Sequence, residues 1–158
     1  MDTQHVQIRW AADEHDLPSA VQLRKEVFCD EQGVPLAEEL DGRDGEAEHL
    51  VALTPDDGRT IGTLRLLVDG SAAKVGRVAV ARDWRRQGIA SRMLVLALQR
   101  AVELGCTRAR LAAQLDAVAL YEQAGFAVES DVFYEANIEH VWMGQMLSRE
   151  AASNGSTP

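Results

Sequence analysis

The sequence predicts an α/β fold, in which a central mixed sheet is flanked by helices. Helical and strand-like patterns alternate through the middle of the 158-residue chain, which is typical of a sheet covered by helices. Short apolar segments also follow one another across Pro55–Gly58 and Asp69–Gly70, and such turns join antiparallel strands. A chain of this length can bury the core of one domain.

Strands are predicted where apolar residues alternate or run between turn signals. In chain order they cover residues 6–10, 48–53, 60–68, 74–80, 108–112, 128–134 and 140–146.

Three helices are predicted from periodicity and end signals. Asp16 is expected to cap the first, which Gly33 ends. The second covers residues 89–104, where apolar residues keep helical spacing, and Gly105 caps it. The third covers 117–124. The sequence contains no internal repeat and no interdomain linker. We therefore expect one domain over 1–147 and a disordered polar tail over 148–158.

Composition excludes several function classes. The net charge of −9 argues against a nucleic-acid surface, which requires a basic footprint. No apolar run reaches the roughly 18 residues that span a bilayer, and the N-terminus does not resemble a secretory signal. Two cysteines do not indicate a disulfide framework, so we expect a cytoplasmic protein. The four histidines are scattered, and we expect no metal site.

The acidic segment, residues 38–46, has two interpretations. It is either a solvated loop or a rim that attracts cationic substrates.

The loop Trp84–Ala90, between a strand and a helix, carries the clearest functional signal. Helix N-terminal amides lack internal partners, and the helix dipole favours an anion there. Gly88 allows close approach of a phosphate, while Arg85 and Arg86 add positive charge. The residues alone therefore indicate a pyrophosphate cradle without naming its ligand. The alternative is a simple turn with solvated arginines.

The loop resembles the R/Q-x-x-G-x-G/A motif of the GNAT acetyltransferase superfamily, as Arg85-x-x-Gly88-x-Ala90. Downstream, Leu120–Phe126 resembles the family's second signature. This resemblance implies a GNAT-type sheet, mostly antiparallel with one splayed parallel strand pair, and acetyl-CoA as co-substrate. It implies coenzyme A contacts at Val78, Ala79, Val80, Arg85, Arg86, Gln87, Gly88, Ile89, Ala90 and Ser91.

Further motifs are similar to those of an ElaA-like and YjcF-like subgroup. They lie in Leu23–Pro35, at Asp41, Asp44 and His49, at Ala113-Gln114, and in Tyr134–Met143. The resemblance covers residues 6–147. One departure is Glu139, where that subgroup usually has proline, and this change alters the backbone leading into His140.

The resemblance assigns catalytic roles to Tyr121 and His140. Tyr121 matches the tyrosine that protonates the departing thiolate, and the alternative is a half-buried aromatic packed beside Phe126. His140 matches a histidine that acts as base in related glyphosate N-acetyltransferases, since imidazole accepts protons near neutrality. Its alternatives are a hydrogen-bonded core or surface residue, or a water chain acting as the base.

The acceptor pocket implied by the resemblance comprises Arg24, His49, Gln114 and Glu135. Arg24 could bind a substrate carboxylate, or it could form a salt bridge to Glu31 or another loop acid.

We therefore expect an N-acetyltransferase that acts on a primary amine of a small molecule by direct attack in a ternary complex. The alternative is a non-catalytic acyl-CoA-binding sensor or partner module. We expect no nucleic-acid or membrane partner and either a monomer or a homodimer. The acceptor's identity is left open.

Overall fold

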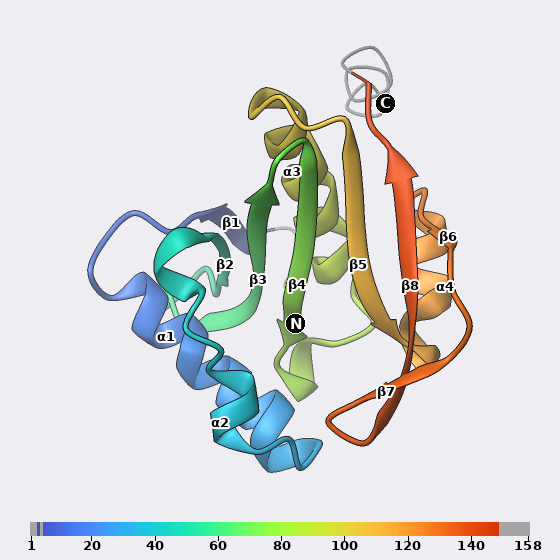
Figure 1. The fold of residues 1–158 in the computed structure, drawn as a ribbon. Helices are drawn as coiled ribbons and strands as arrows, with labels where there is room; N and C mark the ends of the chain where they lie inside the picture. The colour runs from blue at the N-terminus through green and yellow to red at the C-terminus, as the bar shows by residue number, and fades with distance from the viewer. Residues whose placement is uncertain (1–2, 4, 149–158) are drawn as a thin grey trace. The chain divides into compact units, whose positions relative to one another are not determined.

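Sixteen segments of regular structure follow one another along the part of the chain that the computed structural model describes, residues 3 and 5–148 (Figure 1). The strands are β1 Gln7–Trp10, β2 Glu48–Leu53, β3 Thr60–Asp69, β4 Ala72–Val80, β5 Arg108–Gln114, β6 Ala127–Val128, β7 Phe133–Glu135 and β8 Ile138–Met146. The α-helices are α1 Asp16–Arg24, α2 Leu36–Glu39, α3 Ile89–Glu103 and α4 Val118–Gln123. A π-helical segment, η1, covers Lys25–Glu31, and short 3-10 turns cover Asp44–Glu46 (η2), Arg82–Trp84 (η3) and Leu115–Ala117 (η4).

The strands form one sheet in the order β1-β2-β3-β4-β5-β8-β6, and β7 also pairs with β8. β1–β2, β5–β8, β6–β8 and β7–β8 are antiparallel, whereas β4 and β5 are parallel. The parallel register covers only Ala72–Lys74 against Arg108–Arg110 and ends there, although both strands continue. The predicted mixed sheet with a splayed parallel pair is confirmed.

The described residues belong to two compact units, and β3, β4 and α3 each run from one into the other. The first unit contains residues up to Arg65 together with Arg77–Met93. In it, Ala20 of α1 packs on Val51 and Leu53 of β2. The next turn of the helix continues this packing, because Leu23 and Val27 contact Ala79 of β4. Apolar residues spaced along one helical face thus hold α1 and η1 against the strands.

The beginning of α3 lies close to β3 because Gly62 has no side chain. A Cβ atom on Gly62 would stand 3.0 Å from the Cβ of Ala52 and 3.2 Å from the Cγ2 of Ile89. Few real Cβ contacts are so short, so a larger residue would displace Ile89, the first residue of α3. The position of the loop before α3 therefore depends on this glycine.

The second unit contains Leu66–Gly76 and the chain from Leu94 onward. Here β5 alternates between buried and partly exposed residues. Ala109, Leu111 and Ala113 are buried, and α4 contacts the same strand. The opposite face of β5 presents Arg108, Arg110, Ala112 and Gln114, whose cross-strand partners on β8 are Met146, Gly144, Trp142 and His140. On that face of β5, Arg108, Arg110 and Gln114 are partly exposed.

Several sequence predictions require correction. Asp16 is the first residue of α1 rather than its cap, because its carboxylate accepts hydrogen bonds from Arg9 and from the amides of Ala12 and Asp13. The single strand predicted over 128–134 is two short strands, β6 and β7, each paired with β8. The first helix changes to π-helical geometry at Lys25.

The glycine cap predicted at the end of α3 is confirmed. Gly105 ends α3 with a backbone φ of +86°, and the amide of Cys106 donates to the carbonyl of Ala101, as in a glycine cap. The disordered tail was predicted for 148–158, of which residues 149–158 lie outside the described part of the chain.

Candidate functional site

Left-handed residues shape the loop between β4 and α3. Arg86 has a φ of +61° and Gly88 a φ of +83°, and α3 begins directly afterwards, where the amide of Arg92 donates to the carbonyl of Gly88. Left-handed residues within such a loop form concave arrays of backbone N–H groups that bind anions. A Cβ atom on Gly88 would meet nothing within 4 Å, so the space beside this glycine is open to a ligand.

Arg85 holds the loop against the end of β4. Its Nε donates to the carbonyl oxygen of Val80 at 2.8 Å, and its Nη2 lies 2.8 Å from an oxygen of Glu31. The positive charge of Arg85, which the sequence suggested would meet a phosphate, is therefore paired with the carboxylate of Glu31. Arg86 is exposed at the same loop. Arg85 therefore shapes the loop through its contacts with Val80 and Glu31.

Tyr121 is buried on α4, in the second unit. Its ring meets that of Phe126 edge to face, with centroids 6.2 Å apart. Burial, with a smaller contribution from the nearby Asp116 charge, raises the pKa of the Tyr121 phenol to about 12, because both disfavour the phenolate. The hydroxyl therefore stays protonated well above neutral pH.

His140 is buried on β8 beside two of the other predicted site residues. Its Nδ1 lies 2.7 Å from the carbonyl oxygen of Ile138, and its Nε2 lies 3.9 Å from Glu135 Oε2. Gln114 is its cross-strand partner on β5. The hairpin of β7 and β8 places Glu135 near His140. Its turn consists of Ala136 and Asn137, which both have a positive φ, as a two-residue turn requires. The second unit thus brings His140, Glu135 and Gln114 together.

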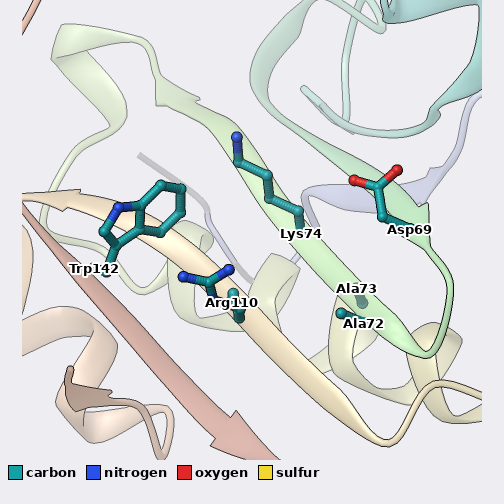
Figure 2. A pocket seen from close by; sticks show the side chains of 6 residues that line it. All are labelled: Asp69, Ala72, Ala73, Lys74, Arg110 and Trp142. Atoms are coloured by element: carbon teal, nitrogen blue, oxygen red, sulfur yellow. The ribbon is translucent and has the colours of Figure 1, made fainter. Parts of the chain in front are cut away.

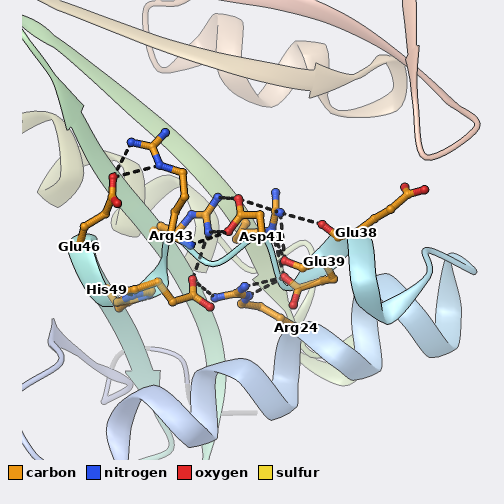
Figure 3. Close-up of polar contacts among 10 residues, drawn as sticks. Arg24, Glu38, Glu39, Asp41, Arg43, Glu46 and His49 are labelled. Carbon is orange, nitrogen blue, oxygen red and sulfur yellow. Dashed lines mark hydrogen bonds and ion pairs between the residues drawn. The ribbon is translucent and has the colours of Figure 1, made fainter.

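Arg24 and His49 belong to the first unit, where they lie in a buried ion network (Figure 3). Arg24 Nε donates to Glu39 Oε1 at 2.7 Å, and its Nη1 donates to Asp44 Oδ1 at 2.9 Å. His49 Nε2 lies 3.0 Å from the carbonyl oxygen of Asp44, while its Nδ1 is buried with no hydrogen-bond partner among the described residues. Arg24 therefore makes the salt bridges to loop acids that were the alternative to binding a substrate carboxylate, although Glu31 is not one of them.

Two further arginines complete this network, which sequence reasoning missed. Arg65 of β3 binds Asp41 and Asp44, with its Nη2 2.7 Å from Asp41 Oδ2. Arg77, left-handed at φ +53° within β4, donates from Nε to Glu39 Oε1 at 3.0 Å. Buried charges require such partners, but the contacts join positions up to 38 residues apart, and no local pattern indicates them.

The network shows that the acidic segment is only partly a solvated loop. Glu39 is 2% exposed, and α2 and η2 take up both ends of the segment, whereas Glu38 and Glu46 are exposed. Hydrogen bonds from Arg65 hold the pKa of Asp41 well below its usual range, and burial only partly opposes them. For Asp44, burial would raise the pKa, but Arg24 and Arg65 together lower it. The carboxylates of Glu39, Asp41 and Asp44 are paired with arginines inside the network, so a rim for cations would have to use the segment's other acidic residues.

No group of three or more His, Cys, Asp or Glu side chains among the described residues is arranged to hold a metal ion. Within the same part of the chain, no helix is both long enough and apolar enough to cross a bilayer.

Comparison with known proteins gives consistent results. Residues 14–147 match the family model described as "Acetyltransferase (GNAT) domain". The chain is 32% identical over 134 residues to the N-acetyltransferase YjcF of Bacillus subtilis, covering 84% of this chain and 94% of the relative.

Solved structures have the same fold. A crystal structure of an acyl-CoA N-acyltransferase from Pseudomonas aeruginosa superposes with a TM-score of 0.79 at 32% identity, covering 89% of this chain and 99% of that one. Escherichia coli ElaA has a TM-score of 0.79 at 23% identity, covering 88% and 99%. These matches confirm the resemblance inferred from the two sequence motifs.

Proposed function

Because the chain belongs to the GNAT acetyltransferase family, we propose that it transfers the acetyl group of acetyl-CoA to a primary amine of a small molecule by direct attack. Membership makes the protein an acyltransferase with acetyl-CoA as donor; the amine and the ternary complex are the proposal. The observation that carries it is the imidazole of His140, whose Nδ1 is bound to the Ile138 carbonyl. Its Nε2 is therefore the atom that can accept a proton.

The loop between β4 and α3 is the proposed site for the donor. The amides near Gly88 and the first turn of α3 would receive the pyrophosphate, with Arg86 beside them. Support comes from the left-handed backbone at Arg86 and Gly88 and from the open space beside the glycine. The backbone of Val78–Val80 would bind the pantetheine arm, and Arg85 keeps the end of that strand in place through the Val80 carbonyl.

His140 is the proposed general base. A primary ammonium has a pKa of about 10.4, so near neutral pH it must lose a proton before it can attack. In this proposal Nε2 takes that proton, and the carboxylate of Glu135, 3.9 Å away, stabilises the resulting imidazolium. The free amine then attacks the thioester carbonyl carbon, forming the C–N bond.

Tyr121 is the proposed general acid. When the tetrahedral intermediate collapses, the C–S bond breaks and the sulfur needs a proton. A phenol with its pKa raised to about 12 is fully protonated near neutrality, and it would give its proton to the sulfur as the C–S bond breaks. The attacking nitrogen loses its proton to solvent, and the Tyr121 phenolate regains one from solvent. The products are an N-acetyl amide and coenzyme A thiol, with no acyl-enzyme.

Among the proposed acceptor residues, Gln114 and Glu135 have the strongest support because both lie beside His140. Arg24 and His49 share the ion network of the first unit. We assign Arg24 a supporting role, since its guanidinium already binds two carboxylates. His49 retains a buried Nδ1 that a ligand or a water molecule could engage. The proposed setting is the cytoplasm, where the thiols of Cys29 and Cys106, both free, would remain reduced.

An amine-panel assay tests the proposal. Purified protein is incubated with acetyl-CoA and individual amines, and free thiol and acetylated amine are both quantified. Equal amounts of the two products, formed only when both substrates are present, are expected. Tight binding of acetyl-CoA without thiol release from any amine would instead support the acyl-CoA-binding sensor.

A further inference from the structure

A pocket on the second unit contains two cations beside an indole ring. We call it the Trp142 pocket; Asp69, Ala72, Ala73, Lys74, Arg110 and Trp142 line it (Figure 2). Arg110 Cζ lies 4.6 Å from the Trp142 ring centroid and Lys74 Nζ lies 5.3 Å from it. Both distances are within the range of cation–π attraction, so the indole holds the two cations at the pocket.

Two cations, Lys74 and Arg110, line the pocket together with one carboxylate, that of Asp69. The two residues are direct partners on β4 and β5, and like charges at such positions repel. Among the described residues, no carboxylate forms an ion pair with either. In contrast, Arg108, two residues earlier on the same face, lies 2.6 Å from Glu129.

Arg110 has a second unsatisfied feature, because its Nε is buried without a hydrogen-bond acceptor among the described residues. A buried donor of this kind is costly unless something binds the group. Two cations and an unsatisfied Arg110 donor, against the one carboxylate of Asp69 in the pocket lining, therefore mark a site for an anion.

Aromatic rings join this pocket to His140. The Phe133 ring stacks on Trp142 with centroids 5.7 Å apart, and on His140 at 5.8 Å. Gln114, the cross-strand partner of His140, lies four residues along β5 from Arg110, which corresponds to about 13 Å of strand. An extended molecule lying along this face could contact both ends.

We propose that the Trp142 pocket binds the carboxylate of the acceptor whose amine lies at His140. This inference rests on the proposed acetyl transfer and names its substrate class: an extended zwitterion whose amine and carboxylate reach both ends of this face, where strand spacing sets the Cα atoms of Arg110 and Gln114 about 13 Å apart. A free amino acid is too short, because only a few bonds separate its charges. An extended peptide of four residues has the required length, since each residue spans at most about 3.6 Å.

The test compares tetraglycine with its C-terminal amide and with glycine. For each, kcat and KM are measured by coenzyme A release, and binding to the enzyme–coenzyme A complex is measured by calorimetry. Tetraglycine is expected to have a KM about tenfold lower than its amide, as a hydrogen bond to a charged group provides. Arg110→Gln and Lys74→Gln should each reduce this preference and leave kcat nearly unchanged. Arg108→Gln is the matched control, and it should keep the preference.

The outcomes separate this inference from the proposed function. Turnover with equal KM for acid and amide, or a preference that survives both Arg110→Gln and Lys74→Gln, overturns the inference while acetyl transfer stands. Acetate provides a second probe of the pocket. If acetate binds at the pocket but does not raise the KM for tetraglycine, the pocket does not bind the carboxylate of the acceptor, and the inference is overturned. If no amine is acetylated, but calorimetry shows an acid preference that Arg110→Gln removes, anion binding is upheld and the proposed function fails.

Discussion

His140 Nδ1 and the carbonyl oxygen of Ile138 lie 2.7 Å apart. A carbonyl can only accept a hydrogen bond, so this contact places the proton of the neutral imidazole on Nδ1 and leaves a lone pair on Nε2. Glu135 faces Nε2 from the hairpin, where it would stabilise the ring once it is protonated. Backbone geometry therefore selects the tautomer that a general base requires.

The first prediction concerns this base. His140→Ala should lower kcat/KM by about 10²- to 10⁴-fold, the range for losing a positioned acid–base group. Proton removal by an imidazole base requires its neutral form, so the pH–rate profile of the wild type should have an acid limb that the variant lacks. Initial rates across pH check this. An unchanged acid limb in His140→Ala would assign proton removal to another group or to a water chain.

Tyr121→Phe tests the acid. We expect kcat to fall by about 10²-fold or more, with little change in the KM of the amine, because only protonation of the leaving thiolate is lost. Since burial raises the pKa of Tyr121 to about 12, the wild-type rate should show no loss from tyrosine ionisation below about pH 10. Full turnover by Tyr121→Phe would remove the phenol from the mechanism.

Gly88→Ala tests the donor loop. Its φ of +83° is unfavourable for alanine, at about 1–2 kcal/mol, so the loop should shift and the KM for acetyl-CoA should rise about tenfold, since about 1.4 kcal/mol corresponds to a factor of ten. The KM for the amine should stay constant. Gly76→Ala is the control, since Gly76 also has open space around its Cβ position but lacks a positive φ. Equal effects of the two substitutions would contradict the role assigned to the loop.

The ion network should make the protein sensitive to acid. Asp41 and Asp44 both have a lowered pKa, so their stabilisation is complete above the unfolded value near 3.9 and is lost as the pH falls below it. Unfolding free energy should therefore decrease between about pH 5 and pH 2. In urea titrations, Asp41→Asn should reduce this decrease by an amount on the order of 1 kcal/mol, given its partial exposure.

The matched control for the acid test is Glu46→Gln. Glu46 pairs with Arg43 at the surface, where ion pairs contribute little, so the pH dependence should not change. If Asp41→Asn and Glu46→Gln have the same profile as the wild type, the network does not govern acid stability.

Local patterns predicted most of the sheet. The strand over 48–53 agrees with β2, and the helix predicted over 89–104 differs from α3 by one residue. The phosphate-loop motif and the tyrosine and histidine motifs could be identified because each is continuous in sequence. Ion pairs between residues far apart in sequence could not be predicted. Hydropathy places Glu39 in solvent, yet Arg24 and Arg77 bury it from positions 15 and 38 residues away.

The Trp142 pocket shows a second limit of sequence reasoning. Lys74, Arg110 and Trp142 come from three strands, and only the sheet register brings them together. Phe133 joins them to His140 through ring stacking. Nothing in the local sequence around any one of these residues distinguishes it from an ordinary strand position, so the pairing of strands had to be known first.

A single-turnover experiment followed by intact-protein mass spectrometry is the most direct test of acetyl transfer without an acyl-enzyme. Enzyme in excess over acetyl-CoA is analysed with and without an amine that the panel identifies as an acceptor. Direct attack predicts that free thiol appears only with the amine, and that the protein never gains the mass of an acetyl group. Thiol released without amine, together with an acetylated protein, would contradict direct transfer.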